Sequence, residues 1–485
     1  MALRPVRAAN LTRTQVLQPG SRLRDAEADW AAPPEEENPL RLRKRPLFII
    51  FLGVPLVIAL GGFVSSGARW PEAPRSLSGP IERGALLDRN GTVLAEGAAD
   101  VRAYPQGPLA AQLIGFSGAE QPDGSYGLEG LERTLDKELQ SGHDVRLTLD
   151  SELQASVQTE LTRAAELHGA LNGAAVYLEA GTGRILATAS YPEFDPNEQR
   201  SLTDRSVVRN SAYLSEVEPG SVMKPLVVAA LLQDGKLKPD ETLAVGETLR
   251  VGDKTFSDVT SHEPILAIKD ILRYSSNVGM IEIGSRLTSA ELAAWYGRYG
   301  FGRSVDVAFV NDSDGQINPP ETWVPQDHAS AVIGQSVSVT ALQLAAAYSI
   351  FANDGRYITP EIVESKVDPN RARQVLSPTI ARTVRDMLTY TVDNSGLVDA
   401  KINGVKVAGK SGSADLYDPE QGYIDAGTLS FAGIFPADKP KIIGVLYLQR
   451  IDEKGALSVS VTAPAFKAIG SQAVALWNQA ELEGR

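Results

Sequence analysis

The stretch Glu218-Pro219-Gly220-Ser221-Val222-Met223-Lys224 joins a Pro-Gly loop to the start of a predicted helix over residues 221–233. Positions i and i+3 of a helix share a face, so the amine of Lys224 comes next to the hydroxyl of Ser221. A serine hydroxyl is a poor nucleophile until a base takes its proton, and burial near the positive end of a helix favours the neutral amine that can be this base. Alone, the pair is a weak signal, because about one Ser-x-x-Lys arises by chance in a chain of this length. Without further support it would be interpreted as two structural residues of a helix.

Two further clusters strengthen the signal. Tyr274-Ser275-Ser276-Asn277-Val278-Gly279 places a hydroxyl and an amide two residues apart, at Ser275 and Asn277, which is enough to relay a proton and to hold a substrate amide. Val405-Lys406-Val407-Ala408-Gly409-Lys410-Ser411-Gly412-Ser413-Ala414 predicts a strand that carries a lysine and a glycine, where a substrate backbone can approach closely. The alternative interpretations are a helix-end or loop motif for the first cluster and an edge strand with a solvated lysine for the second.

Composition limits the class of protein. The 485 residues suffice for about three domains, and 43% apolar with 22% charged residues is typical of globular proteins. The net charge of −13 argues against a nucleic-acid partner. The absence of cysteine excludes a thiol nucleophile, a disulfide and a cysteine-bound metal, and the four histidines lack the spacing of a metal-binding helix face. The sequence therefore predicts neither metal nor cofactor.

The N-terminal part of the chain predicts a membrane anchor. The 23 residues 46–68 carry no charge, and as a helix of about 1.5 Å rise per residue they would cross a hydrocarbon layer ~30 Å thick. Arg41, Arg43, Lys44 and Arg45 directly precede them, so we expect residues 1–45 to form a disordered cytoplasmic tail and residues 69–485 to lie outside the cytoplasmic (inner) membrane. Two alternatives are a cleaved signal peptide, which usually has a shorter apolar run, and a buried core helix.

The remaining periodicity predicts strands in two separated groups with helices between them. Such an order is typical of an α/β or α+β domain with an antiparallel sheet flanked by helices. Hairpins are predicted at 81–95, around Asn90-Gly91, and at 173–190. Further strands are expected at 405–409, 429–435 and 441–448, and helices at 151–167, 221–233, 267–286, 340–352, 377–393 and 463–481.

Taken in order, Ser-x-x-Lys, Ser-x-Asn and Lys-Ser-Gly resemble the motif set of the penicillin-binding and serine β-lactamase superfamily. Flanking segments from about residue 80 to 470 resemble class B penicillin-binding proteins, the monofunctional peptidoglycan transpeptidases. Arg209-Asn210-Ser211-Ala212 and Ser276-Asn277-Val278-Gly279 favour the division-specific, FtsI-like branch over the elongation branch. The other similar segments are Glu82-Arg83-Gly84, Asp88-Arg89-Asn90-Gly91, Leu94-Ala95, Gly127-Leu128-Glu129-Gly130-Leu131-Glu132, Leu147-Thr148-Leu149-Asp150, Phe194-Asp195-Pro196-Asn197, residues 334–345 and Asn353-Asp354-Gly355.

This resemblance implies a role for each motif residue. Ser221 would attack the D-Ala-D-Ala carbonyl of a peptidoglycan stem peptide, and Lys224 would accept its proton. The backbone N–H groups of Ser221 and Ser413 would form the oxyanion hole, and β-lactams would inhibit the enzyme at the same serine. Of the remaining motif residues, Ser275 would pass the proton to the leaving amine, Asn277 would hold the donor peptide, and Lys410 with Ser411, Gly412 and Ser413 would bind the terminal carboxylate.

The resemblance also implies partners and a domain division. We expect a reduced non-catalytic pedestal at 69–145, in which most of the module present in relatives is missing, and a transpeptidase domain at 146–485. Expected partners are a polytopic FtsW-like glycan polymerase and other division proteins. The third motif reads Lys-Ser-Gly-Ser where Lys-Thr-Gly-Thr is commoner, and both hydroxyls survive. The alternatives are a non-catalytic division-complex scaffold, an elongation-type transpeptidase and a β-lactam-sensing or β-lactam-hydrolysing relative.

Overall fold

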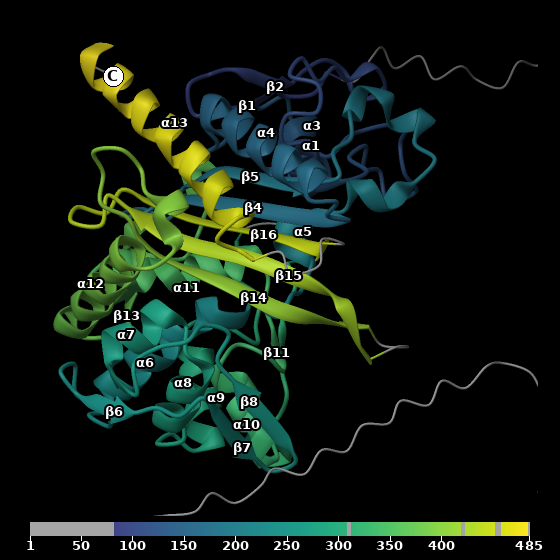
Figure 1. Cartoon of the computed structure of the whole chain (residues 1–485). Coiled ribbons are helices and arrows are strands. Elements are labelled where there is room, and N and C mark those ends of the chain that lie inside the picture. The colour runs from purple at the N-terminus through teal and green to yellow at the C-terminus, as the bar shows by residue number, and fades with distance from the viewer. Residues whose placement is uncertain (1–81, 308–311, 419–421, 452–456, 484–485) are drawn as a thin grey trace, which may run out of the picture. The chain divides into compact units, whose positions relative to one another are not determined.

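A five-stranded antiparallel sheet organises the chain in the computed structural model, which describes residues 82–307, 312–418, 422–451 and 457–483 (Figure 1). The strand order is β14-β15-β16-β4-β5, so strands from both ends of the described chain lie side by side. Strands β16 and β4 make this junction, with Val445 opposite Val176. The five strands are β4 (Asn172–Glu179), β5 (Ile185–Tyr191), β14 (Ala408–Asp418), β15 (Gly422–Phe435) and β16 (Ile442–Ile451).

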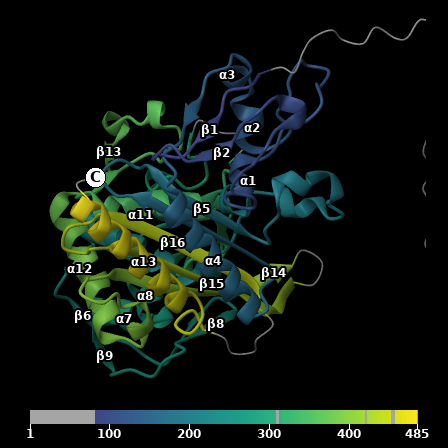
Figure 2. The same cartoon turned by 90° about the horizontal axis from the view of Figure 1, so that it is seen from above.

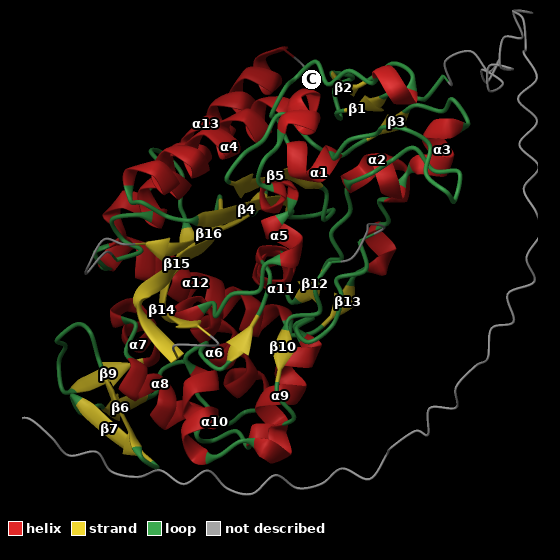
Figure 3. Ribbon diagram, turned by 90° about the vertical axis from the view of Figure 1, so that its right-hand side faces the viewer, coloured by secondary structure: helices red, strands yellow, loops and turns green. Residues whose placement is uncertain are grey.

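Helices cover both faces of this sheet. Along β4, Val176 and Leu178 face one cluster of buried side chains while Ala175 and Tyr177 face the other, because successive side chains of a strand alternate between faces. The second cluster packs under α4 (Ser151–Leu167) and α13 (Thr462–Glu483), which lie over the sheet in Figure 2. The first cluster includes α6 (Lys224–Gln233), α8 (Asn277–Gly284) and α11 (Ala341–Ala352), on the opposite side of the sheet from α4 and α13 (Figure 3).

The central helix α11 shows why this layer is so apolar. All twelve of its residues are buried, so it has no polar face, as expected for a helix enclosed on every side. Its start is fixed by a capping box, in which the Thr340 hydroxyl accepts from the Gln343 N–H and the Gln343 side chain accepts from the Thr340 N–H. The cap and the complete burial together make α11 a rigid element of this helical layer.

The residues between 82 and 150 form a small layer beside the sheet. β1 (Leu86–Leu87) pairs with β2 (Val93–Ala95) across the predicted Asn90-Gly91 turn, and with β3 (Val145–Arg146) in parallel. Arg83 is buried there with ion pairs of 2.7 Å to Glu132 and to Asp136. Removing one member of such a buried pair leaves an uncompensated charge, so this cluster fixes the local structure.

Several predicted elements are confirmed, and three boundaries were wrong. The hairpins at 81–95 and 173–190 and the helices at 151–167, 340–352, 377–393 and 463–481 match the structure to within a few residues. The strand predicted at 405–409 begins three residues later, because the backbone turns between Ile402 and Val405 and β14 starts at Ala408. The predicted helix 221–233 begins with a 3-10 turn, η4 (Gly220–Met223), and the predicted helix 267–286 is broken in two.

The sequence also missed short elements that lie far from the sheet. Two hairpin-like pairs, β6 with β9 and β7 with β8, occupy the segment between α6 and α7. The remaining strands are β6 (Thr242–Ala244), β7 (Thr248–Val251), β8 (Lys254–Ser257), β9 (Ile265–Ala267), β10 (Gln316–Ile317), β11 (Val337–Ser338), β12 (Arg356–Tyr357) and β13 (Arg373–Gln374). The remaining helices are α1 (Ala111–Ile114), α2 (Gly130–Thr134), α3 (Asp136–Gln140), α5 (Ser211–Leu214), α7 (Ile268–Tyr274), α9 (Ser289–Arg298), α10 (Pro325–Val332) and α12 (Pro378–Asn394).

The predicted cytoplasmic tail at 1–45 and anchor at 46–68 lie outside the described residues. Across the described part of the chain, no helix has the length and apolar character that crossing a membrane requires. The anchor and the domain boundary at 145–146 therefore stay predictions.

Candidate active site

The three motif clusters converge on one cavity of about 430 Å³ between the sheet and the helical layer below it. Residues from all three line it, although up to 192 positions separate the first from the last in the sequence. The motif residues in its lining are Ser221, Ser275, Asn277, Lys410, Ser411 and Ser413. Two motif residues are not in the lining: Lys224, which is fully buried, and Gly412.

Glycine allows the turn that carries Ser221 to lie directly against strand β14. Gly220 has φ +64°, and a Cβ there would lie 2.6 Å from the carbonyl oxygen of Ser413. A Cβ on Gly412 would in turn lie 2.6 Å from the carbonyl oxygen of Pro219. The Gly220 N–H also donates to the Gly334 carbonyl at 2.9 Å. No other residue type fits at these contacts without displacing backbone, so glycine here sets the distance between the Ser221 turn and β14.

Lys224 is fully buried and lacks a carboxylate partner among the described contacts. Its Nζ donates to the Ser275 carbonyl at 2.6 Å and to Asn277 Oδ1 at 2.8 Å, and lies 3.3 Å from Ser275 Oγ. Burial holds the pKa of Lys224 well below its usual range, and the nearby charge of Lys410 lowers it further. A neutral amine has two hydrogens for these two acceptors and keeps a lone pair for a proton, as a general base requires.

The Ser275–Asn277 segment is a turn between two helices and not part of one helix as predicted. Ser275 has φ +57°, in the left-handed region, which ends α7 and costs a non-glycine residue about 1–3 kcal/mol. Ser276 then caps α8, because its hydroxyl accepts from the Gly279 N–H at 2.8 Å. The break points Ser275 Oγ at both lysines, a direction that a continuous helix would not give it.

Lys410 is buried and lies at the edge strand of the sheet. Its side chain is inside the protein although β14 pairs with only one neighbour, so the alternative of a solvated lysine is wrong. Its Nζ donates to Ser275 Oγ and to the Ser411 carbonyl, both at 3.0 Å. Burial lowers the pKa of Lys410 to about 7. Ser275 Oγ thus stands between two amines of lowered pKa, the geometry of a proton relay.

The free edge of β14 faces the cavity with Ser411 and Ser413. In register, Ser411 lies opposite Phe431 and Gly412 opposite Ser430 on β15, which leaves the other edge of β14 open to a ligand in extended conformation. Sequence reasoning missed Ser458, which is buried before α13 and donates to the Gly412 carbonyl while its Oγ lies 3.1 Å from Ser413 Oγ. A lone serine 45 residues away gave no signal for this contact.

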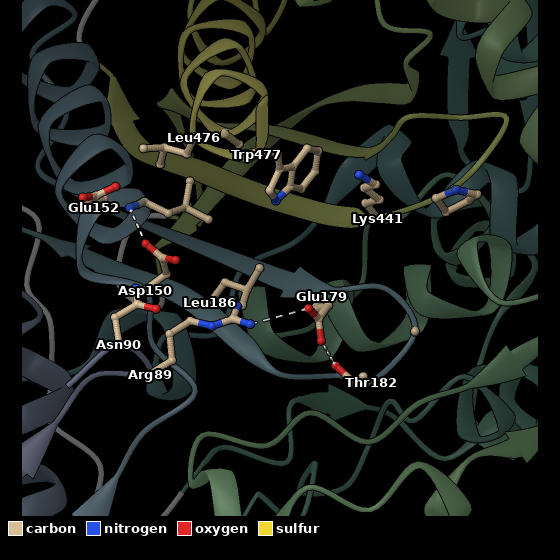
Figure 4. A pocket seen from close by; sticks show the side chains of 14 residues that line it. Arg89, Asn90, Asp150, Glu152, Glu179, Thr182, Leu186, Lys441, Leu476 and Trp477 are labelled. Carbon is tan, nitrogen blue, oxygen red and sulfur yellow. Dashed lines mark hydrogen bonds and ion pairs between the residues drawn. The ribbon is translucent and has the colours of Figure 1, made fainter. Parts of the chain in front are cut away.

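A second cavity, of about 620 Å³, lies between the small layer, the β4–β5 turn and α13 (Figure 4). Its polar groups are partnered with one another: Arg89 forms an ion pair with Glu179, and the Thr182 hydroxyl donates to the same carboxylate. Lys441 lies over the Trp477 ring at 5.0 Å. This cavity brings no hydroxyl next to a buried amine, so we place the chemistry in the first cavity.

Comparison with known proteins agrees with this geometry. The family described as "Penicillin binding protein transpeptidase domain" matches residues 173–470, which include every motif residue above. The chain belongs to this transpeptidase family. Among penicillin-binding relatives, the chain is 31% identical to "Peptidoglycan D,D-transpeptidase FtsI" of Escherichia coli K12, over 76% of this chain and 66% of FtsI. It is also 31% identical to "Penicillin-binding protein PbpB" of Mycolicibacterium smegmatis, over 72% of this chain and 60% of PbpB.

Solved structures of penicillin-binding proteins have the same fold. The apo crystal structure of penicillin-binding protein 3 from Mycobacterium tuberculosis superposes with a TM-score of 0.74 at 31% identity, covering 82% of this chain and 97% of that one. A second crystal structure of that protein is a complex with aztreonam, with a TM-score of 0.73. The predicted family and the predicted antiparallel α/β architecture are therefore confirmed. The chain spans only 60% and 66% of the length of PbpB and FtsI, respectively.

Proposed function

We propose that this chain is a peptidoglycan D,D-transpeptidase that cross-links stem peptides through a serine acyl-enzyme. The observation that carries the proposal is the buried Lys224 amine, which follows Ser221 by three residues and contacts both residues of the Ser-x-Asn motif. The relatives named peptidoglycan D,D-transpeptidases support the same reaction class.

In the proposed reaction, Ser221 Oγ forms a bond to the carbonyl carbon of the penultimate D-Ala while Lys224 accepts the hydroxyl proton. Backbone N–H groups of Ser221 and Ser413 stabilise the oxyanion. The bond to the terminal D-Ala nitrogen then breaks, and Ser275 passes a proton to that nitrogen. The amine of a second stem attacks the acyl-enzyme, which forms the cross-link and frees Ser221.

The polar groups of β14 would hold the donor. Lys410, Ser411 and Ser413 would bind the terminal carboxylate, Asn277 would bind the stem amide, and the chain of the stem would lie along the free edge of β14. A β-lactam presents a carboxylate and a reactive carbonyl to the same groups, so it would acylate Ser221 and inhibit.

The product assay tests the proposal directly. Purified protein is incubated with a donor stem ending in D-Ala-D-Ala and a D-amino acid acceptor, and we expect release of D-Ala with formation of the exchanged product. A fluorescent penicillin should label the protein at Ser221 by peptide mapping. Labelling without any product in the presence of candidate activating partners would favour the alternative of a non-catalytic scaffold.

The lowered pKa of Lys410 predicts how the rate of penicillin acylation depends on pH. Because its pKa is about 7, Lys410 is an ammonium at lower pH and loses its charge as the pH rises through 7. The second-order rate constant of penicillin acylation, which reports groups of the free enzyme, should therefore fall above pH 7. Lys410→Arg keeps a charge at every pH and should lose this alkaline decline, whereas Lys410→Ala should be slow throughout. An alkaline decline of equal size in Lys410→Arg would contradict carboxylate anchoring by Lys410.

We further propose that the chain is a single-pass protein of the cytoplasmic membrane that works in septal wall synthesis beside an FtsW-like polymerase. The uncharged residues 46–68 after a basic cluster and the similarity to FtsI support this. A reporter after residue 485 should be active only outside the cytoplasm, and depletion should give filaments. Rounded cells with normal septa would instead point to elongation.

A further inference from the structure

An acidic side chain outside the three motifs holds the Ser275–Asn277 turn. Asp258 directly follows strand β8, and its side chain is 6% exposed. Its Oδ1 accepts from the backbone N–H groups of Asn277 at 2.5 Å and Val278 at 3.0 Å. Its Oδ2 accepts from the Ser276 hydroxyl at 2.6 Å. One carboxylate thus satisfies three donors at the start of α8, the helix that carries Asn277.

The end of β8 also fixes the Asn277 side chain. Asn277 Nδ2 donates to the Ser257 carbonyl at 3.0 Å, so its Oδ1 is the atom that turns toward Lys224. The segment 257–258 therefore sets both the backbone and the side-chain direction of Asn277. The same segment also holds the turn at Ser275. The backbone of Ser275 is in the left-handed region, and its side chain contacts both lysines.

A histidine holds Asp258 in turn. His262 Nε2 lies 2.8 Å from Asp258 Oδ2, and its Nδ1 lies 2.8 Å from the Glu263 carbonyl, with only 5% of the side chain exposed. Both facing atoms are acceptors, so the imidazolium form donates to each of them, and these contacts with the Glu263 carbonyl and with Asp258 raise the pKa of His262. Tyr274 packs its ring at 5.8 Å from the imidazole, and Arg273 and the Glu263 carboxylate lie around that tyrosine.

We infer that Asp258, held by His262, is a positioning residue that fixes Ser275 and Asn277 for acylation, an inference that rests on the proposed reaction at Ser221. Neither side chain needs to touch the substrate. The two side chains affect the rate of acylation. In that step the proton leaves Ser221, and its transfer depends on how Ser275 and Asn277 face Lys224. Binding of the donor carboxylate depends on this loop only through the contact of Ser275 with Lys410, since Ser411 and Ser413 lie on β14.

The test separates the binding constant K from the acylation rate constant k2 by stopped-flow labelling of the full chain with a fluorescent penicillin. Asp258→Asn keeps the shape of the side chain but turns an NH2 group toward two of its donors. We expect k2 to fall about 10- to 100-fold, as for a small misplacement of a reacting group, and K to change by a smaller factor because Lys410, Ser411 and Ser413 still bind the carboxylate. The matched control is Glu263→Gln, which removes a neighbouring carboxylate that contacts Tyr274 and not the turn, and should leave k2 unchanged.

A second pair of variants keeps the inference testable if Asp258→Asn folds poorly. His262→Gln can still donate to Asp258 and should keep most of k2, whereas His262→Leu cannot and should fall toward Asp258→Asn. Equal k2 values in His262→Leu, Asp258→Asn and Glu263→Gln, with labelling still at Ser221, would overturn the positioning role and leave the proposed function intact. Absence of labelling in the unmodified chain would instead count against the proposed function.

Discussion

Ser221→Ala is expected to abolish covalent labelling by a fluorescent penicillin, a loss on the order of 10⁶-fold in rate and therefore below detection. The structure gives Ser221 a position that the other serines of the cavity lack. It lies on the η4 turn, whose backbone is in contact with β14 at Gly412 and Ser413, and one turn before Lys224. Ser275 Oγ is held by Lys410, and Ser413 Oγ lies against Ser458, so neither is placed to take over.

The measurement is gel fluorescence after long incubation, with thermal unfolding as the check on folding. Ser395→Ala is the matched control, since Ser395 also lines the cavity but lies outside the three motifs. It should label at the unmodified rate. Labelling of Ser221→Ala at any serine of the cavity would refute the assignment of the nucleophile.

Lys224→Ala should lower the acylation rate by about 10²- to 10⁴-fold, which is the usual contribution of general-base catalysis. Two roles of this lysine need to be separated, because its amine is the proposed base for Ser221 and also ties Ser275 to Asn277. Lys224→Arg distinguishes them. Arginine can still donate to the two oxygen acceptors, but it stays charged at any accessible pH and cannot accept a proton.

If the amine acts as a base, Lys224→Arg should be as slow as Lys224→Ala. A rate for Lys224→Arg near that of the unmodified chain would mean that the lysine only holds the turn together. The pH profile of the unmodified chain adds a second readout: because burial keeps the pKa of Lys224 well below its usual range, the base form should appear at a lower pH than for an ordinary lysine.

Sequence reasoning could find those parts of the site that lie within one turn or one strand. Ser221 with Lys224, Ser275 with Asn277, and Lys410 with its neighbours are short-range patterns, and the sheet hairpin at 173–190 follows from alternation and turn residues. The antiparallel order of the sheet and the helices on both of its faces were likewise accessible. These features depend on residues that are close in the sequence, so their pattern can be recognised without the structure.

Other parts of the site depend on contacts that no local pattern encodes. Asp258 and Ser458 reach the motifs from 18 and 46 residues away, as single polar residues with ordinary spacing, and His262 acts through Asp258. The break at Ser275 was missed because the apolar residues on either side suggested one helix over 267–286, and the helix-end interpretation of Ser275, Ser276 and Asn277 was only an alternative. Tertiary contacts impose this break. Asp258 accepts hydrogen bonds from the first N–H groups of the next helix, and two lysines donate to the Ser275 hydroxyl.

The pairing of β16 with β4 has a consequence for how the chain reaches its folded state. β4 is synthesised some 260 residues before β16, its partner in the sheet. Until then the buried residues of β4, from Gly173 to Leu178, have an unpaired edge that can associate with other chains. High contact order of this kind slows folding. The η4 turn, which rests on β14, therefore gains its support only after nearly the whole chain has been made, and the nascent fragment before that point is the species most exposed to aggregation.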